Sequence, residues 1–106
     1  MTLISPVTDE RQQIVFRIDT GADMTVVPRS VLIELKIGSR GHLLVADYDS
    51  RMVYSSYHVV TLLLGKHRFK DVEVIAAESD TAYLGLDVLN QLRLTHDGPN
   101  KTLILH

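Results

Sequence analysis

Residues 16–23 read Phe16-Arg17-Ile18-Asp19-Thr20-Gly21-Ala22-Asp23, and this stretch decides the expected fold. A short apolar strand leads directly into Asp-Thr-Gly, so the carboxylate of Asp19 lies at the end of a strand. Gly21 lets the backbone turn tightly and approach a neighbour closely. The Thr20 hydroxyl can donate and accept hydrogen bonds, so it can hold a loop in place. Taken alone, the triplet is equally compatible with a plain turn, because Asp and Gly are common turn residues.

A second segment, residues 81–92, reads TAYLGLDVLNQL. It predicts an apolar strand that ends at Gly85 and a short helix over Leu86–Leu92. A further helix is expected over Val27–Lys36, with Pro28 at its first position and Gly38 just after its end.

The rest of the chain predicts strands. Val, Ile and Thr are abundant, and short apolar runs recur between turn signals, which is typical of a sandwich or a barrel. The segment His42–Leu64 is expected to form a long hairpin with a polar turn at Asp47–Ser50. The runs that predict strands are Ile14–Ile18, Leu43–Ala46, Val59–Leu64, Val72–Ala77 and Leu103–Leu105.

Composition narrows the class of protein. The chain has 106 residues, the length of one ordinary domain, and we expect residues 1–106 to fold as a single domain. Hydrophobic residues make up 45% and charged residues 23%, which excludes a disordered tail or a collagen-like fibre. The apolar runs are too short to cross a bilayer. The net charge of −2 forces no basic face, so nucleic acid is not expected as a partner.

The chain has no cysteine, which excludes disulfide scaffolds, cysteine nucleophiles and cysteine-based metal sites. Five histidines are present, but their spacing matches no short ligand motif, so no metal site is expected. No motif of a serine hydrolase or of a nucleotide-binding loop occurs. The N-terminus lacks the features of a signal peptide, and we expect a cytoplasmic location.

The order of the chain's features resembles the retropepsin-like, or retroviral-type, aspartic proteases, in particular their single-domain bacterial relatives. That order is strand, Asp-Thr-Gly-Ala, helix, hairpin, further strands, apolar-Leu-Gly and helix. The segment Leu89–Pro99 is similar to those relatives too, and the resemblance extends from about Ile14 to Leu105. It implies an all-β fold, a closed acid-protease-type barrel with one or two short helices.

The resemblance implies an aspartic endopeptidase that requires no cofactor. In such an enzyme two carboxylates share one proton, because like charges so close together cannot both ionise. One carboxylate activates a water as general base, and the protonated one polarises the scissile carbonyl. The chain has a single Asp-Thr-Gly, and Asp23, Asp87 and Asp97 lack the context of a second member. A symmetric homodimer, with one Asp19 from each protomer, is therefore expected.

The remaining site residues are implied by the resemblance. Thr20 would hydrogen-bond across the dimer axis, and Gly21 would lie along the substrate backbone and accept a hydrogen bond from it. Ala22 would line a subsite, and Asp23 would bind the substrate main chain.

The hairpin tip, Val45–Tyr54, would be a flap that closes over a peptide or protein substrate and excludes water. Tyr48 or Tyr54 would contact the substrate there, although either is equally explained as a half-exposed strand residue. Leu84 and Val26 would form apolar walls of the cleft, unless they are simple core residues.

The chain departs from the family in two places. Leu86 stands where retroviral enzymes carry an arginine that pairs with an acidic residue, and the expected flap contains no glycine. The segments Thr2–Ile4 and Thr102–Leu105, which could pair at the base of a dimer, are short. A non-catalytic peptide-binding or dimerisation module on the same fold is the main alternative, and a generic β domain with a chance triplet is a third.

Overall fold

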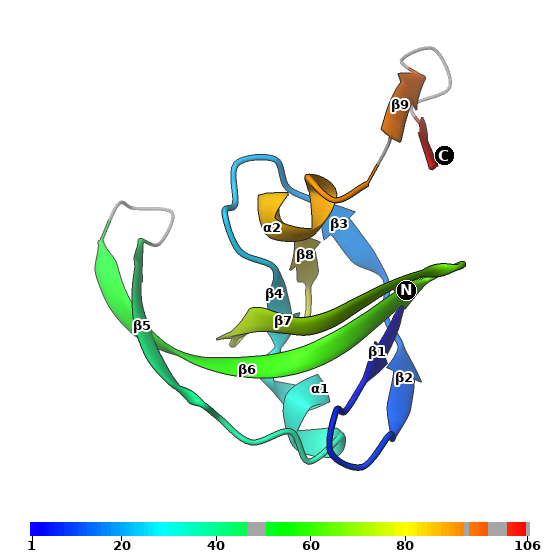
Figure 1. The fold of residues 1–106 in the computed structure, drawn as a ribbon. Helices are drawn as coiled ribbons and strands as arrows, with labels where there is room; N and C mark the ends of the chain where they lie inside the picture. The colour runs from blue at the N-terminus through cyan, green and yellow to red at the C-terminus, as the bar shows by residue number, and fades with distance from the viewer. Residues whose placement is uncertain (47–50, 93, 98–101, 106) are drawn as a thin grey trace.

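The computed structural model describes residues 1–46, 51–92, 94–97 and 102–105, the last two ranges as backbone only. The all-β class is confirmed, because two short helices accompany ten strands in this part of the chain (Figure 1). No helix among these residues is long and apolar enough to span a membrane. The elements are β1 (Thr2–Ile4), β2 (Arg11–Gln13), β3 (Phe16–Ile18), β4 (Val26–Pro28), α1 (Arg29–Glu34), β5 (Gly41–Ala46), β6 (Met52–Leu64), β7 (His67–Ala77), β8 (Ala82–Leu84), α2 (Leu86–Leu89), β9 (Leu94–Asp97) and β10 (Thr102–Leu105).

Eight of the described strands form one sheet in the order β2-β1-β6-β7-β4-β8-β3, and β5 pairs with β6 beside this path. The sheet curls strongly, with the long strands β6 and β7 bending around the interior (Figure 1). Two of the pairings are parallel, β3 with β8 and β4 with β7, and they bring the two sequence motifs to adjacent strands. Strands β9 and β10 form a separate two-stranded sheet.

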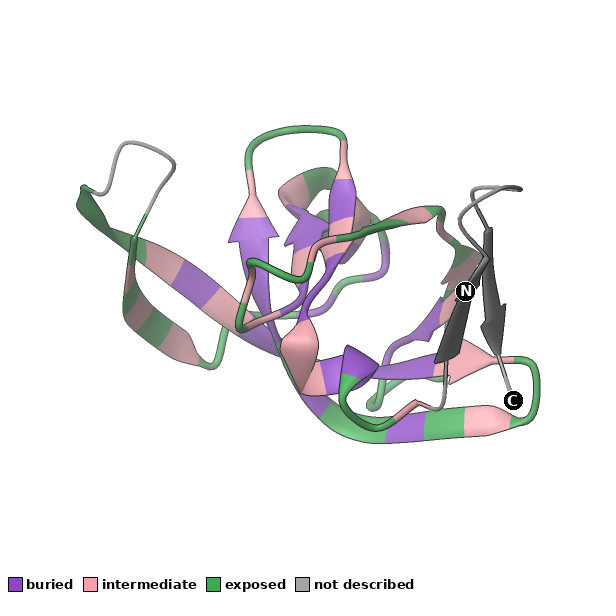
Figure 2. Cartoon of the chain, turned by 90° about the horizontal axis from the view of Figure 1, so that it is seen from above, coloured by how far each residue is buried: buried purple, intermediate pink, exposed green. Residues whose placement is uncertain are grey.

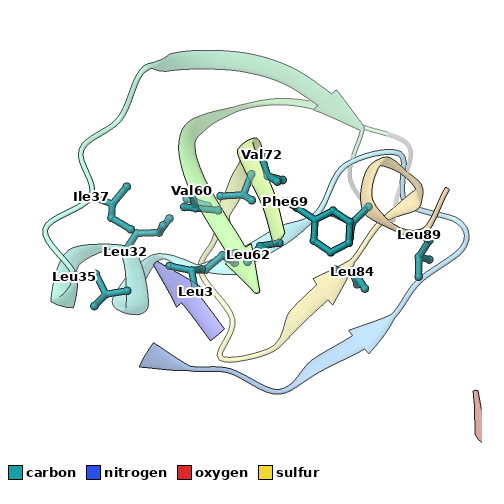
Figure 3. Close-up of a cluster of buried hydrophobic side chains, with 14 residues drawn as sticks. Leu3, Leu32, Leu35, Ile37, Val60, Leu62, Phe69, Val72, Leu84 and Leu89 are labelled. Carbon is teal, nitrogen blue, oxygen red and sulfur yellow. The ribbon is translucent and has the colours of Figure 1, made fainter. Parts of the chain in front are cut away.

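The core fills the concave side of the curled sheet. Leu3, Val60, Leu62 and Val74 are fully buried, and Leu32 of α1 closes the core at one end (Figure 3). Figure 2 shows the buried residues along the central strands and exposed residues along the outer part of the β5–β6 hairpin. Burial of each large apolar side chain contributes about 1.5–3 kcal/mol, so this core holds the strands that carry the site.

Helix α1 is shorter than the sequence predicts. Val27 and Pro28 lie in β4 and pair with β7 in a parallel ladder, so the helix begins only at Arg29. Its end is also different. The helix ends at Glu34, and Lys36, with φ of 56°, adopts the left-handed conformation two residues before Gly38. Helix α2 ends at Leu89, three residues before the expected Leu92. Tertiary strand pairing overrides the local helical preference at the start of α1.

The expected hairpin over His42–Leu64 is confirmed. Strands β5 and β6 pair in register from Gly41 opposite Tyr57 to Ala46 opposite Met52. The expected turn, Asp47–Ser50, lies outside the described residues.

The expectation for the N-terminal strand is wrong. β1 is paired on one edge with β2 and on the other with β6, so Thr2–Ile4 has no free edge for pairing at the base of a dimer. The apolar Leu3 and Ile4 are buried there, which explains why the strand lies inside the sheet. β10, the other expected base strand, pairs with β9.

Candidate active site

Asp19 follows β3 directly, and the backbone holds it on both sides. Its N–H donates to the carbonyl of Leu84 at 3.0 Å, and its own carbonyl accepts from the N–H of Ala22 at 3.2 Å. The first bond continues the parallel pairing in which Ile18 lies opposite Leu84. The position of the carboxylate is therefore fixed by the pairing of β3 with β8.

The carboxylate is oriented by the next turn of the loop. The Gly21 N–H donates to Oδ1 of Asp19 at 3.0 Å, a charge-assisted bond that fixes the side chain. A Cβ at Gly21 would lie 3.3 Å from the same oxygen, so a larger residue would press on the carboxylate. Asp19 is half-buried, whereas Thr20 and Gly21 are exposed at the surface. Oδ1 is thus held in place while the two following residues face outward.

The second motif crosses beneath this loop at Gly85. A Cβ there would lie 2.6 Å from the carbonyl carbon and oxygen of Met24 and 2.9 Å from the carbonyl oxygen of Ala22. Two further bonds join the chains at the crossing: Leu86 N–H donates to Ala22 O at 2.8 Å, and Asp87 N–H donates to Asp23 O at 3.2 Å. Only glycine fits such a close backbone approach, which is the physical reason for a glycine after the apolar strand.

A hydrogen-bonded pair, the buried Thr25 hydroxyl and the partly buried Asp87 carboxylate, stabilises the same crossing. The Thr25 hydroxyl donates to Oδ1 of Asp87 at 2.8 Å and accepts from the Gly85 N–H at 3.1 Å. The Thr25 N–H donates to Oδ2 of Asp87 at 3.2 Å. Both oxygens of Asp87 are therefore engaged, which agrees with its exclusion as a second catalytic carboxylate. The sequence showed Asp87 within the second motif, but it did not indicate Thr25 as its partner.

A cleft of about 680 Å³ opens above the Asp19 loop. Asp19 and Ala22 line it, together with the arms of the hairpin, Val45–Ala46 and Val53–Ser55. The end of β7 and the segment after it, Ile75–Ser79, complete the wall. The cleft thus combines a carboxylate, a mostly apolar lining and the edges of extended strands, which suits an extended peptide.

The structure brings several of the expected site residues to this cleft. Asp19, Gly21, Ala22, Val26 and Tyr54 all line it. Tyr54 is 76% exposed on β6, so its ring is available to a bound molecule.

Other expected site residues lie elsewhere. The Leu84 side chain is 4% exposed and packs in the core beside Leu89 and Phe69, so it differs from the expected cleft wall (Figure 3). Asp23 is exposed in the loop, where its carbonyl contacts α2. Tyr48 lies outside the described residues.

Leu86, at the position where retroviral enzymes carry an arginine, makes apolar and backbone contacts. The Leu86 side chain packs against the core, and its N–H holds the Asp19 loop through Ala22. The loop is therefore tied to α2 by backbone bonds and by Asp87, without an ion pair at this position.

Arg29, Glu78 and Tyr83 are among the cleft residues that were not predicted from the sequence. Arg29 is the first residue of α1, and its Nε donates to Oε1 of Glu78 at 2.8 Å. Tyr83 faces the cleft from β8, where its neighbours Ala82 and Leu84 are buried. The alternation of β8 could have indicated Tyr83, but no local signal indicated Arg29 or Glu78. Among the described residues, no group of three or more His, Asp or Glu side chains is placed to hold a metal ion.

Comparison with known proteins agrees with this geometry. Residues 6–91 match the family described as "gag-polyprotein putative aspartyl protease". The crystal structure of a retropepsin-like aspartic protease from Rickettsia conorii is similar in fold, with a TM-score of 0.66 and 17% sequence identity. The alignment covers 99% of this chain and 79% of that chain. No curated protein matches the sequence. The chain therefore belongs to the gag-type aspartyl protease family and has the retropepsin-like fold.

Proposed function

We propose that this protein is an aspartic endopeptidase that acts as a symmetric homodimer. Each protomer contributes one Asp19, and the two carboxylates share one proton and activate a water. The observation that carries the proposal is Asp19 itself, held by Leu84, Ala22 and Gly21 at the floor of an extended cleft. Family membership supports a protease-type site.

The exposed part of the loop supports the dimer. Thr20 and Gly21 are exposed beside the half-buried Asp19. A twofold axis next to this loop would bring two identical carboxylates together, as a shared proton requires. The Gly21 N–H takes one acceptor site on Oδ1 of Asp19, so the carboxylate keeps other acceptor sites for the water and the partner carboxyl.

The catalytic step then follows from the paired carboxylates. The unprotonated carboxylate removes a proton from the water as it attacks the scissile carbonyl carbon, and the protonated carboxyl donates to the carbonyl oxygen. The leaving nitrogen then receives the proton that the first carboxylate took from the water, and the C–N bond breaks. The hydroxyl formed on the former carbonyl oxygen returns its proton to the second carboxylate, which restores the pair. The hairpin arms would act as a flap that excludes bulk water from the cleft.

The alternative is a peptide-binding or dimerisation module on the same fold. The exposed apolar residues of the hairpin arms, Leu44, Met52 and Val53, favour a surface that binds an extended chain with or without turnover. An intact carboxylate oriented by a backbone N–H favours catalysis, because binding alone needs no such group.

A cleavage assay on a mixed peptide library between about pH 4 and about pH 7 tests the proposal. Asp19→Asn is the key variant, since the amide oxygen can still accept from Gly21 and the fold is retained. Asp71→Asn is the matched control, because Asp71 is exposed on β7, away from the cleft, and its left-handed φ of 56° suits asparagine. We expect Asp19→Asn to lose at least about a hundredfold in kcat/KM and Asp71→Asn to match the wild type. Peptide binding without cleavage by a folded, dimeric wild type would instead establish the binding module.

A further inference from the structure

A single cation faces the cleft among its described lining residues, and that cation is Arg29. The rest of the lining is mostly apolar, apart from Asp19, Glu78 and a few hydroxyl groups. The Arg29 side chain lines the cleft and is 40% exposed. A single guanidinium in a mostly apolar lining can bind a negatively charged group of a ligand.

A series of hydrogen bonds through two buried side chains, Ser56 and His58, holds Arg29 in place. Nη1 of Arg29 donates to the Ser56 hydroxyl at 3.3 Å, and Ser56 lies 3.0 Å from Nε2 of His58. Nδ1 of His58 lies 3.1 Å from the carbonyl of Ile37, which can only accept, so Nδ1 carries a proton. In the neutral imidazole Nε2 then accepts from Ser56, whose oxygen is left to accept from Arg29. Ser56 and His58 are each 5% exposed, so the chain is shielded from water.

The other partner of Arg29, the Glu78 carboxylate, is far more exposed than Ser56. Oε1 of Glu78 accepts from Nε of Arg29 at 2.8 Å, but the Glu78 side chain is 81% exposed. Glu78 lies in the connection between β7 and β8. Because an exposed ion pair contributes little to stability, Glu78 can leave the guanidinium at little cost, whereas Arg29 is held by buried groups.

We propose that Arg29 forms a subsite for an acidic side chain of the substrate, and that Glu78 occupies this subsite in the unliganded chain. The inference rests on the proposed peptidase function and names the class of peptide that the enzyme prefers. An aspartate or glutamate side chain would take the place of the Glu78 carboxylate on the planar guanidinium. A basic side chain paired with Glu78 would face the fixed charge of Arg29, so it is disfavoured.

The test uses one cleavable peptide in which each position is changed in turn to Glu, Gln or Lys. With the wild type, we expect one position at which Glu exceeds Gln by about tenfold in kcat/KM, mainly through KM. Arg29→Gln should bring this ratio close to one. Glu78→Gln should raise it, because the competing carboxylate is removed. Arg68→Gln, an exposed arginine on β7 outside the cleft, should keep the wild-type ratio.

Binding separates this inference from the proposed function. The same peptides are titrated by fluorescence anisotropy into chains that carry Asp19→Asn, with and without Arg29→Gln, so turnover plays no part. A Glu preference in Kd that depends on Arg29 supports the subsite even if the wild type cleaves nothing, an outcome that would refute only the peptidase. Glu78→Gln, at an exposed residue, gives an independent readout if Arg29→Gln does not fold.

Three results would overturn the inference. The first is a wild type that cleaves or binds peptides with no preference for Glu over Gln at any position. The second is an acid preference that survives in folded Arg29→Gln. The third is a preference for Lys that disappears in Glu78→Gln, which would make Glu78 the determinant instead.

Discussion

The Thr25 hydroxyl donates to the carboxylate of Asp87 at 2.8 Å, although 62 residues separate them in the chain. This bond joins the loop that carries Asp19 to the first turn of α2. Thr25 is fully buried, and its hydroxyl also accepts from the Gly85 N–H, so one hydroxyl bonds to two residues of the second motif. The geometry of the loop that carries Asp19 therefore depends on a residue pair that does not itself line the cleft.

Removal of this hydroxyl should weaken the fold. Thr25→Val leaves the Gly85 N–H without its acceptor and should lower the free energy of unfolding by about 1–3 kcal/mol. Asp87→Ala should cost a similar amount, because the Thr25 N–H and the Thr25 hydroxyl proton lose their acceptor. Urea denaturation of both single variants and the double variant should show non-additive losses, with a coupling of about 0.5–3 kcal/mol. Strictly additive losses would mean that the two residues act independently.

Gly85→Ala should be among the most damaging single substitutions in the chain. The new Cβ would meet the Met24 carbonyl at 2.6 Å, and backbone atoms on both sides prevent an easy shift. We expect a loss of about 3 kcal/mol or more in the free energy of unfolding, measured by urea denaturation.

Gly38→Ala is the matched control for this substitution. A Cβ at Gly38 meets nothing within 4 Å, so its effect should stay within about 0.5 kcal/mol. Equal stability losses at the two glycines would show that the close approach at Gly85 does not decide the outcome.

If the active form is a dimer, adding the Asp19→Asn variant to the wild type should inhibit the peptidase activity of the wild type. A protomer with Asp19→Asn pairs with a wild-type protomer to give a dimer with only one catalytic carboxylate. At a fixed amount of wild type, an equal amount of Asp19→Asn should lower activity to about one half if subunits exchange freely. An equal amount of Asp71→Asn should not inhibit. Activity that ignores added Asp19→Asn, at concentrations where both chains are dimeric, would contradict a shared site.

Activity should be highest at acidic to mildly acidic pH. The proposed pair works with one proton, so kcat/KM should fall as pH rises and both carboxylates become ionised. It should also fall at the lowest pH, where both are protonated and neither can act as base. The profile is measured with circular dichroism at each pH to separate lost activity from unfolding. Undiminished activity at strongly alkaline pH would exclude the carboxylate pair.

The sequence by itself determined the local features of the site. An apolar strand that ends in Asp-Thr-Gly places Asp19 at a strand end, and the hairpin over His42–Leu64 follows from alternation and turn residues. The end of an apolar strand at Gly85 was also visible in the second motif, whereas the close backbone approach that requires a glycine there was not. These features depend on neighbours within a few residues, so periodicity and turn chemistry are sufficient to predict them.

Only the tertiary structure decided which distant residues meet. Because β4 pairs with β7 in parallel, Val27 and Pro28 form a strand and not the expected start of a helix. The same pairing places Arg29 at the cleft beside Glu78. β1 lies between β2 and β6 because its apolar side chains complete the core. The Thr25–Asp87 bond arises in the same way. Such contacts are set by the register of strands far apart in the chain, and local propensity carries no information about that register.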